Sequence, residues 1–222
     1  MKDRMLVGRS AAVVGAGGLG CTVLYCLAAA GLGRITVVDG DRVEESNLNR
    51  QLLYGYGDIG GYKAELAAKR LTEQYPGLSL EHICEAVDEG NAQSIIKGHD
   101  IVLSCVDSIE ARLTLNRAAA ALGIPLTDAG ISGYSGRVMS VMYGETPCLE
   151  CLFGSAKGEK QPVLGACVVA VGALQAKAAI ALLEGRDDPT LHGMLMIDLM
   201  DYHFDLVPVK RTPGCPACGK KG

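Results

Sequence analysis

The chain has 222 residues, of which 49% are hydrophobic and 21% are charged. This composition supports a buried core and excludes a disordered, highly charged polypeptide. The formal net charge is −4 and the sequence contains no dense run of Lys or Arg, which argues against a nucleic-acid-binding surface. No linker or internal repeat divides the sequence, so we expect a single domain over residues 1–222.

The cysteine content and the apolar segments indicate a cytoplasmic protein. Nine cysteines is an odd number, and no cleavage-type signal precedes them, which disfavours a secreted disulfide scaffold. The apolar run 164–183 contains Gln175 and Lys177 near its middle, which is typical of a buried core helix and not of a membrane span. We therefore expect no membrane partner.

The first two thirds of the chain alternate between short apolar runs and helical patterns. Strands are predicted over 11–14, 35–39, 80–84, 101–104 and 124–128, with helices over 18–30, 63–75, 89–97 and 110–122. Elements of this length in this order are typical of parallel strands joined by right-handed helical crossovers. The expected fold class is α/β, with a Rossmann-like, doubly wound and mostly parallel sheet.

After residue 133 the pattern changes. A strand over 137–143 is expected to leave the parallel core, and 148–161 is expected to form a loop. A long helix is predicted over 168–183, followed by an antiparallel pair of strands over 195–198 and 204–209.

A glycine-rich loop follows the first predicted strand. Gly15, Gly17, Gly18 and Gly20 match G-x-G-x-x-G between a strand and a helix, and Asp39 ends the next strand. Glycines allow the backbone to approach a phosphate at the helix N-terminus, and a carboxylate at Asp39 can accept both ribose hydroxyls. The pattern favours a nucleotide over a ligand-free turn, but by itself it leaves NAD and ATP open.

Positive charges after Asp39 favour a triphosphate. The loop continues with Asp41, Ser46, Asn47, Asn49, Arg50 and Gln51, and Lys63 opens the next helix. NAD has only a diphosphate and needs an apolar slot for its nicotinamide, whereas a triphosphate requires Arg, Lys or magnesium. Arg50 and Lys63 therefore fit ATP better.

Asp107 follows the predicted strand 101–104, at the end of the sheet where open α/β sheets bind ligands. A carboxylate there is a suitable magnesium ligand. The alternative is that Asp107 caps the following helix, a task that Ser108 can also perform.

Four cysteines form two Cys-x-x-Cys pairs, Cys148/Cys151 and Cys215/Cys218. This pattern predicts a structural Zn²⁺ site closed by four thiolates, with disulfides or free thiols as the alternative. Loss of the metal is expected to loosen the C-terminal third and to leave the glycine loop intact.

These motifs together resemble the ThiF/MoeB/HesA family of ubiquitin-activating-like adenylyltransferases, from about Val7 to Gly219. The resemblance implies a homodimer that uses ATP and Mg²⁺ to adenylate the C-terminal glycine of a ubiquitin-fold sulfur carrier protein ending in Gly-Gly, in sulfur-containing cofactor biosynthesis. It leaves the carrier and the pathway open.

The resemblance also assigns roles to individual residues. It implies that Gly18 contacts ATP, Asp39 holds the ribose, Asn47 and Arg50 meet the phosphates, Lys63 approaches the α-phosphate and Asp107 supports Mg²⁺. Arg50, Lys63 and Asp107 are the predicted catalytic residues. The predicted nucleotide-binding set is Gly15, Gly17, Gly18, Gly20, Asp39, Asp41, Ser46, Asn47, Asn49, Arg50, Gln51, Lys63, Asp107 and Ser108.

The chain departs from the family pattern at three places. Only ten residues precede the first predicted strand, so Arg4 and Arg9 are the sole candidates for the arginine that family members extend into the neighbouring subunit. Ser108 stands where asparagine is usual. The segment 152–166, where sulfur-transferring relatives can carry a linking cysteine, has none. Cys167 comes next and is either a buried thiol or a nucleophile.

Three other functions stay open. They are an NAD-binding oxidoreductase, an enzyme that adenylates a small or tRNA-borne carboxylate, and a scaffold without full ATP turnover. The remaining cysteines, Cys21, Cys26, Cys84 and Cys105, are expected in the core. His82, His99, His192 and His203 have no spacing that suggests a site.

Overall fold

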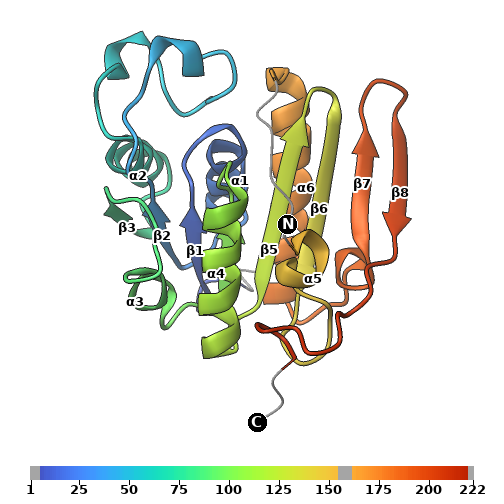
Figure 1. Ribbon diagram of the computed structural model, residues 1–222. Coiled ribbons are helices and arrows are strands. Elements are labelled where there is room, and N and C mark those ends of the chain that lie inside the picture. The colour runs from blue at the N-terminus through green and yellow to red at the C-terminus, as the bar shows by residue number, and fades with distance from the viewer. Residues whose placement is uncertain (1–5, 155–161, 220–222) are drawn as a thin grey trace.

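The computed structural model describes residues 6–154 and 162–219. In this part of the chain the backbone forms one eight-stranded sheet with the order β3-β2-β1-β4-β5-β6-β7-β8 (Figure 1). The strands are β1 (Ser10–Val14), β2 (Arg34–Val38), β3 (Ser79–Ile83), β4 (Ile101–Ser104), β5 (Leu126–Ser132), β6 (Ser135–Val141), β7 (Met194–Asp198) and β8 (His203–Val207).

The first five strands are parallel and the last three are antiparallel. β1 lies in the middle of the parallel part, where its residue Val13 is in register with Val37 of β2 and Leu103 of β4. Every residue of β1 and β4 is buried, as expected for strands covered on both faces. The predicted mostly parallel sheet with C-terminal antiparallel strands is confirmed.

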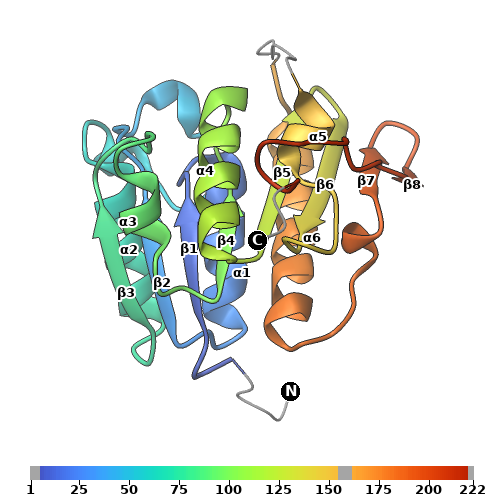
Figure 2. The ribbon, with the colours of Figure 1, turned by 60° about the horizontal axis from the view of Figure 1, so that its bottom comes forward.

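Helices cover both faces of the sheet (Figures 1 and 2). The helices are α1 (Gly18–Ala29), α2 (Lys63–Gln74), α3 (Ala92–Ile96), α4 (Ile109–Leu122), α5 (Leu149–Phe153) and α6 (Gly165–Leu183), with 3-10 turns at Glu45–Asn47, Tyr56–Asp58 and Pro189–Leu191. The apolar side chains of α1, α2 and α6 share one core, and those of α3, α4 and α5 share the other.

The long helix α6 is apolar and long enough to cross a membrane, but 56% of that stretch is buried inside the protein. It packs against α1 and against β4, β5 and β6. The approach to α1 is close, because a Cβ on Gly172 would lie 2.9 Å from the Cβ of Thr22. Its packing is therefore that of a core helix.

The boundaries of three elements differ from the sequence-based prediction by three residues or more. β5 continues past Asp128 to Ser132 because all seven of its residues pair with β6, so tertiary pairing outweighs the low strand propensity of its glycine. α3 begins only at Ala92, because the Asp88 carboxylate accepts the N–H groups of Gly90 and Asn91 in a turn. α6 begins three residues before the predicted start, at Gly165.

The expectation of a continuous loop over 148–161 is wrong for its first part, which contains the short helix α5. The first N–H of α5, at Leu149, donates to the side chain of Asn116 in α4. This long-range bond stabilises a turn that local sequence does not predict. Residues 155–161 lie outside the described residues.

Candidate functional site

A cavity of about 690 Å³ opens at the carboxyl ends of β1, β2 and β4. The chain leaves β1 toward β2 on one side and returns to β4 on the other, so this is the point where the strand order reverses. The segment between β2 and α2 rises above this end of the sheet (Figure 1). The predicted residues that line the cavity are Gly15, Gly17, Gly18, Asp39, Asp41, Asn47, Arg50, Gln51, Lys63, Asp107 and Ser108.

The glycine loop lies directly against its neighbours. Gly15 has a φ of +97°, and a Cβ there would lie 2.6 Å from the backbone oxygen of Cys105. A Cβ on Gly18 would lie 2.6 Å from the side chain of Val168. Gly20 does not line the cavity, but a Cβ on it would lie 1.9 Å from the backbone oxygen of Gly15. Glycine is therefore required at these three positions, because a side chain would collide with the neighbouring backbone or with Val168. We call this loop, from Gly15 to Gly20, the glycine cradle.

Asp39 is held in place by two backbone donors at the cavity wall. Its Oδ2 accepts the N–H of Ala16 at 2.7 Å, and its Oδ1 accepts the N–H of Asp41 at 2.8 Å. Burial raises the pKa of the Asp39 carboxyl above its usual value, although both N–H donors and the Lys63 charge act in the opposite direction. The carboxylate is therefore oriented before any ligand binds.

Four basic side chains line the same cavity, and two of them, Lys63 and Arg50, are predicted site residues. The side chain of Lys63 is 7% exposed, and its Nζ lies 2.8 Å from Oδ2 of Asp41, whose side chain is 77% exposed. Arg50 donates from Nη1 to the backbone oxygen of Ser46 and to Oδ1 of Asn49, both at 2.9 Å. Ser46 and Asn49 do not line the cavity. Their contacts orient Arg50, which does.

Gln51 is 4% exposed and lines the cavity, and its Oε1 accepts no hydrogen bond from the described residues. An unpaired buried amide oxygen is costly, so it indicates a missing donor. Together with the glycine cradle, this orphaned atom fits a bound nucleotide.

The sequence left open whether Asp107 binds magnesium or caps the helix that follows β4. Ser108 is the N-cap of α4, and its Oγ accepts the N–H of Ala111 at 3.2 Å. Asp107, the residue before the cap, lines the cavity.

Sequence reasoning missed a buried ion cluster next to this loop. Asp128 in β5 is fully buried and accepts hydrogen bonds from Arg112, from Arg137 at 2.6 Å and from the Ser104 hydroxyl at 2.8 Å. Arg112 also lines the cavity and donates to the backbone oxygen of Val106. The signal in the sequence was Asp128, the one charged residue of strand β5. A buried charge is almost always paired, so Asp128 indicated a basic partner elsewhere in the chain.

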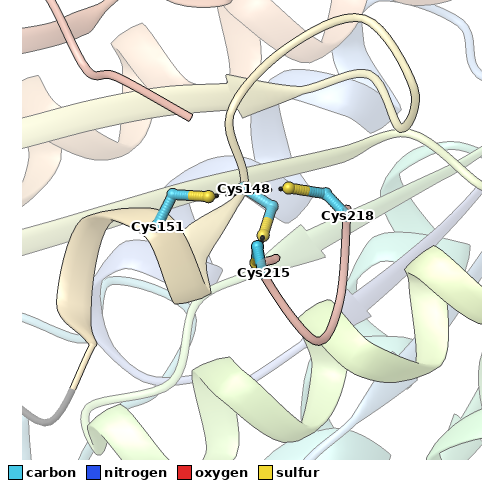
Figure 3. A group of neighbouring side chains, drawn as sticks. All are labelled: Cys148, Cys151, Cys215 and Cys218. Carbon is cyan, nitrogen blue, oxygen red and sulfur yellow. Dashed lines mark hydrogen bonds between the residues drawn. The ribbon is translucent and has the colours of Figure 1, made fainter. Parts of the chain in front are cut away.

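The four cysteines converge at one point (Figure 3). Their Sγ atoms all lie within 4.8 Å of one another, with Cys148 and Cys215 at 3.7 Å and Cys151 and Cys218 at 3.5 Å. These separations exceed the disulfide bond of about 2.05 Å. They are close to the edge of about 3.8 Å of a tetrahedron with Zn–S bonds of about 2.3 Å. The cluster is therefore compatible with zinc.

Of the other candidates among the described residues, Cys105 lines the cavity and the rest do not. Cys167 is 5% exposed, near the start of α6. Burial raises the pKa of Cys21 to about 12, as expected for a core thiol. Arg9 pairs with Asp100 at the opposite end of the strands from the cavity, and Arg4 lies outside the described residues. The buried His99 contacts the Thr36 hydroxyl and the backbone oxygen of Ile96.

The remaining cysteines and histidines divide by burial. Cys105 is buried, while Cys26 and Cys84 are half-buried and pack against the core. His82, His192 and His203 are exposed.

The doubly wound sheet, the glycine cradle and the cavity define an α/β protein with the architecture of a nucleotide-binding domain. The model of the ThiF family matches residues 4–217, and the chain belongs to this family. The predicted family is therefore confirmed.

Named relatives cover nearly the whole chain. It is 36% identical to the SAMP-activating enzyme E1 of Haloferax volcanii, over 100% of this chain and 84% of that protein. It is 38% identical to the sulfur carrier protein adenylyltransferase of Thermus thermophilus, over 95% and 82%. It is 34% identical to the molybdopterin-synthase adenylyltransferase of Escherichia coli, over 94% and 86%. The fold is similar to that of MccB from E. coli, solved with AMPCPP and MccA, with a TM-score of 0.87 at 23% identity over 97% of this chain and 68% of that one.

Proposed function

We propose that this protein is an ATP-dependent adenylyltransferase that activates the C-terminal glycine of a small ubiquitin-fold sulfur carrier protein ending in Gly-Gly, in the biosynthesis of a sulfur-containing cofactor. The observation that carries the proposal is that one cavity is lined by the glycine cradle, Asp39, Asp107 and basic residues that include Arg50 and Lys63. The names of the three sequence relatives support the same activity and substrate class.

The reaction joins two anions, which explains the positive charge in the cavity. A carboxylate oxygen of the terminal glycine attacks the α-phosphorus of ATP, an O–P bond forms, and the bond to the oxygen bridging to the β-phosphorus breaks. Pyrophosphate leaves with that electron pair. No general base is required, because the attacking carboxylate is already ionised at pH 7. Cations fixed in place before the reaction stabilise the charge that develops, and correct positioning contributes roughly 7–11 kcal/mol in favourable systems.

Each lining residue has a role in this proposal. The glycine cradle at Gly15, Gly17 and Gly18 admits the phosphates, and the oriented Asp39 carboxylate accepts the ribose hydroxyls. Gly20 packs the loop against helix α1, while Ser108 caps α4 beside the site. Residues proposed to meet the phosphates are Asn47, Arg50 and Lys63, whereas the orphaned Oε1 of Gln51 would accept from a hydroxyl or amino group of the nucleotide.

The pair of Lys63 and Asp41 provides a cation that is buried but available. Asp41 is largely exposed, so its carboxylate can return to water when a phosphate takes its place beside Lys63. Lys63 itself is already in place, and it loses little side-chain freedom on binding.

Two metal ions complete the proposal. Mg²⁺ held by Asp107 would neutralise phosphate charge. Zn²⁺ held by Cys148, Cys151, Cys215 and Cys218 would be structural, because four thiolates leave no position for water. A homodimer, a cytoplasmic location and a single domain over residues 1–222 remain predictions of the family resemblance and composition.

Carrier-dependent exchange of labelled pyrophosphate into ATP tests the proposed function. We expect exchange with a Gly-Gly-ended carrier encoded near this gene, and none with the same carrier lacking its last glycine. Exchange driven by a small carboxylate without any carrier would favour the alternative substrate. Tight NAD binding without exchange would contradict the proposal.

A further inference from the structure

Asn116 in α4 bonds to one cysteine of the four-cysteine cluster and to two residues next to it in the fold or sequence. The residue is fully buried, and its Nδ2 donates to Sγ of Cys148 at 3.6 Å. Its Oδ1 accepts the N–H of Leu149 and the hydroxyl of Tyr143, both at 3.1 Å. The Tyr143 hydroxyl also contacts the backbone oxygen of Asn116 at 2.9 Å. No other role is evident for a buried amide at this position.

The same helix reaches the nucleotide cavity at its other end. Arg112 lies four residues before Asn116, which places both side chains on one face of α4. Arg112 donates to the backbone oxygen of Val106, in the loop that carries Asp107. The helix is capped at Ser108, about 12 Å along the axis from Asn116. α4 is therefore a rigid connection between the cysteines and the Asp107 loop.

Among the described residues the glycine loop makes no hydrogen bond to the cysteine cluster, and it meets the segment before Asp107 where Gly15 packs on the backbone of Cys105 and Val106. It lies between β1 and α1, and α1 packs in the core with α2 and α6. Cys148, Cys215 and Cys218 pack in the opposite core, with the apolar side chains of α3 and α4. A change at the cluster thus reaches the Val106–Asp107 loop through α4 before it reaches the glycine loop.

We propose that Asn116 is a positioning residue through which metal bound by the four cysteines fixes α4, and with it Arg112 and the Val106–Asp107 loop. An amide donor to a ligating sulfur orients that ligand, and the two bonds accepted by Oδ1 hold the turn that presents it. Metal occupancy then sets the order of the loop at the nucleotide cavity. The consequence for Mg²⁺ and ATP rests on the proposed function, whereas the consequence for the loop does not.

The decisive variant is Asn116→Asp, which keeps an acceptor for Leu149 and Tyr143 but places a carboxylate oxygen against the sulfur of Cys148. The matched control is Arg117→Ala. Arg117 is the next residue of α4 and also contacts the cysteine region, through Glu150 at 2.8 Å, but its side chain is 48% exposed. Water reaches the Arg117 end of this pair, although the Glu150 side chain is 11% exposed, so we expect the pair to contribute less to positioning than the buried Asn116.

The test uses the full-length, zinc-loaded protein and two measurements that need no nucleotide. The first is the rate of Zn²⁺ transfer to a chelator, which we expect to rise about 10–100-fold in Asn116→Asp, because the bound metal is held less tightly, and to stay unchanged in Arg117→Ala. The second is backbone amide exchange by mass spectrometry. In the wild type, zinc removal should accelerate exchange several-fold in 106–113 and leave 18–24 unchanged, and zinc-loaded Asn116→Asp should already exchange fast in 106–113.

Three outcomes decide the proposal. It is overturned if Asn116→Asp retains the wild-type rates of zinc transfer and amide exchange, or if zinc removal accelerates 18–24 as much as 106–113. If Asn116→Asp does not fold, the wild-type comparison with and without zinc still decides it, because unchanged exchange in 106–113 refutes the connection. Separately, absence of MgATP binding to the wild type would contradict the proposed function and leave the exchange result for Asn116 standing.

Discussion

Substitution of the buried Asp128 by Asn is expected to destabilise the fold strongly. The side chain keeps its size but loses the charge that pairs with Arg112 and Arg137. Asp128 is 0% exposed and the side chain of Arg112 is 6% exposed, so the arginine would remain buried without its counter-ion. Breaking a buried pair in this way costs about 3–5 kcal/mol, compared with about 0–1 kcal/mol for an exposed pair.

Urea unfolding at pH 7, followed by far-UV circular dichroism because the chain has no tryptophan, measures this loss. The control is Asp187→Asn, which removes the exposed partner of His192 and should change stability by less than about 0.5 kcal/mol. A loss below about 1 kcal/mol for Asp128→Asn, with an unchanged denaturant slope, would refute the reasoning.

The pH dependence gives an independent check on the same residue. Burial would raise the pKa of Asp128, but the charges of Arg112 and Arg137 outweigh burial and hold this pKa below its usual value. The stabilisation is therefore complete above the unfolded pKa of about 3.9 and is lost as the pH falls through the lower folded value. The difference between wild type and Asp128→Asn should narrow below about pH 4. A constant difference from pH 7 to acid would show that the carboxyl is not ionised in the fold.

Three further predictions concern the cavity and α6. Asp107→Ala should abolish pyrophosphate exchange with fold and zinc content unchanged, and wild-type exchange in this variant would refute the magnesium assignment. Lys63→Met should lower kcat by about 10²–10³-fold, the usual cost of losing one fixed charge-stabilising group, and a loss under about tenfold would remove Lys63 from the reaction. Cys167→Ser should leave adenylation near normal, since Cys167 is 5% exposed and does not line the cavity, and a large loss would show that its thiol takes part.

The features that sequence predicted well are those encoded by local spacing. The glycine loop requires a strand, a turn and a helix in succession, and all three are visible in the local sequence. The spacing of the two Cys-x-x-Cys pairs predicted that the four cysteines lie together, as they do. The parallel pairing of the first five strands follows from the helical crossovers predicted between them. Lys63 and Arg50 could be predicted as neighbours of a bound anion, because basic residues follow the end of the strand at Asp39, and both line the cavity.

The features that sequence missed depend on contacts between distant segments. The pairing of Arg112 with Asp128 requires α4 to lie over β5, and neither segment alone specifies its partner. Helix α5 depends on the bond from Leu149 to Asn116, 33 positions earlier. Ser46 and Asn49 are predicted ligand contacts, and the structure adds that both accept hydrogen bonds from Arg50, a contact that depends on the fold of that loop.

The proposed reaction transfers AMP from ATP to the terminal carboxylate of a carrier protein. Mass spectrometry of a Gly-Gly-ended carrier, incubated with this protein, ATP, Mg²⁺ and hydroxylamine, tests it most directly. We expect a hydroxamate at the last glycine of the carrier, formed only when both ATP and the protein are present. An unmodified carrier, recovered from a mixture in which the protein binds ATP and contains its zinc, would contradict it.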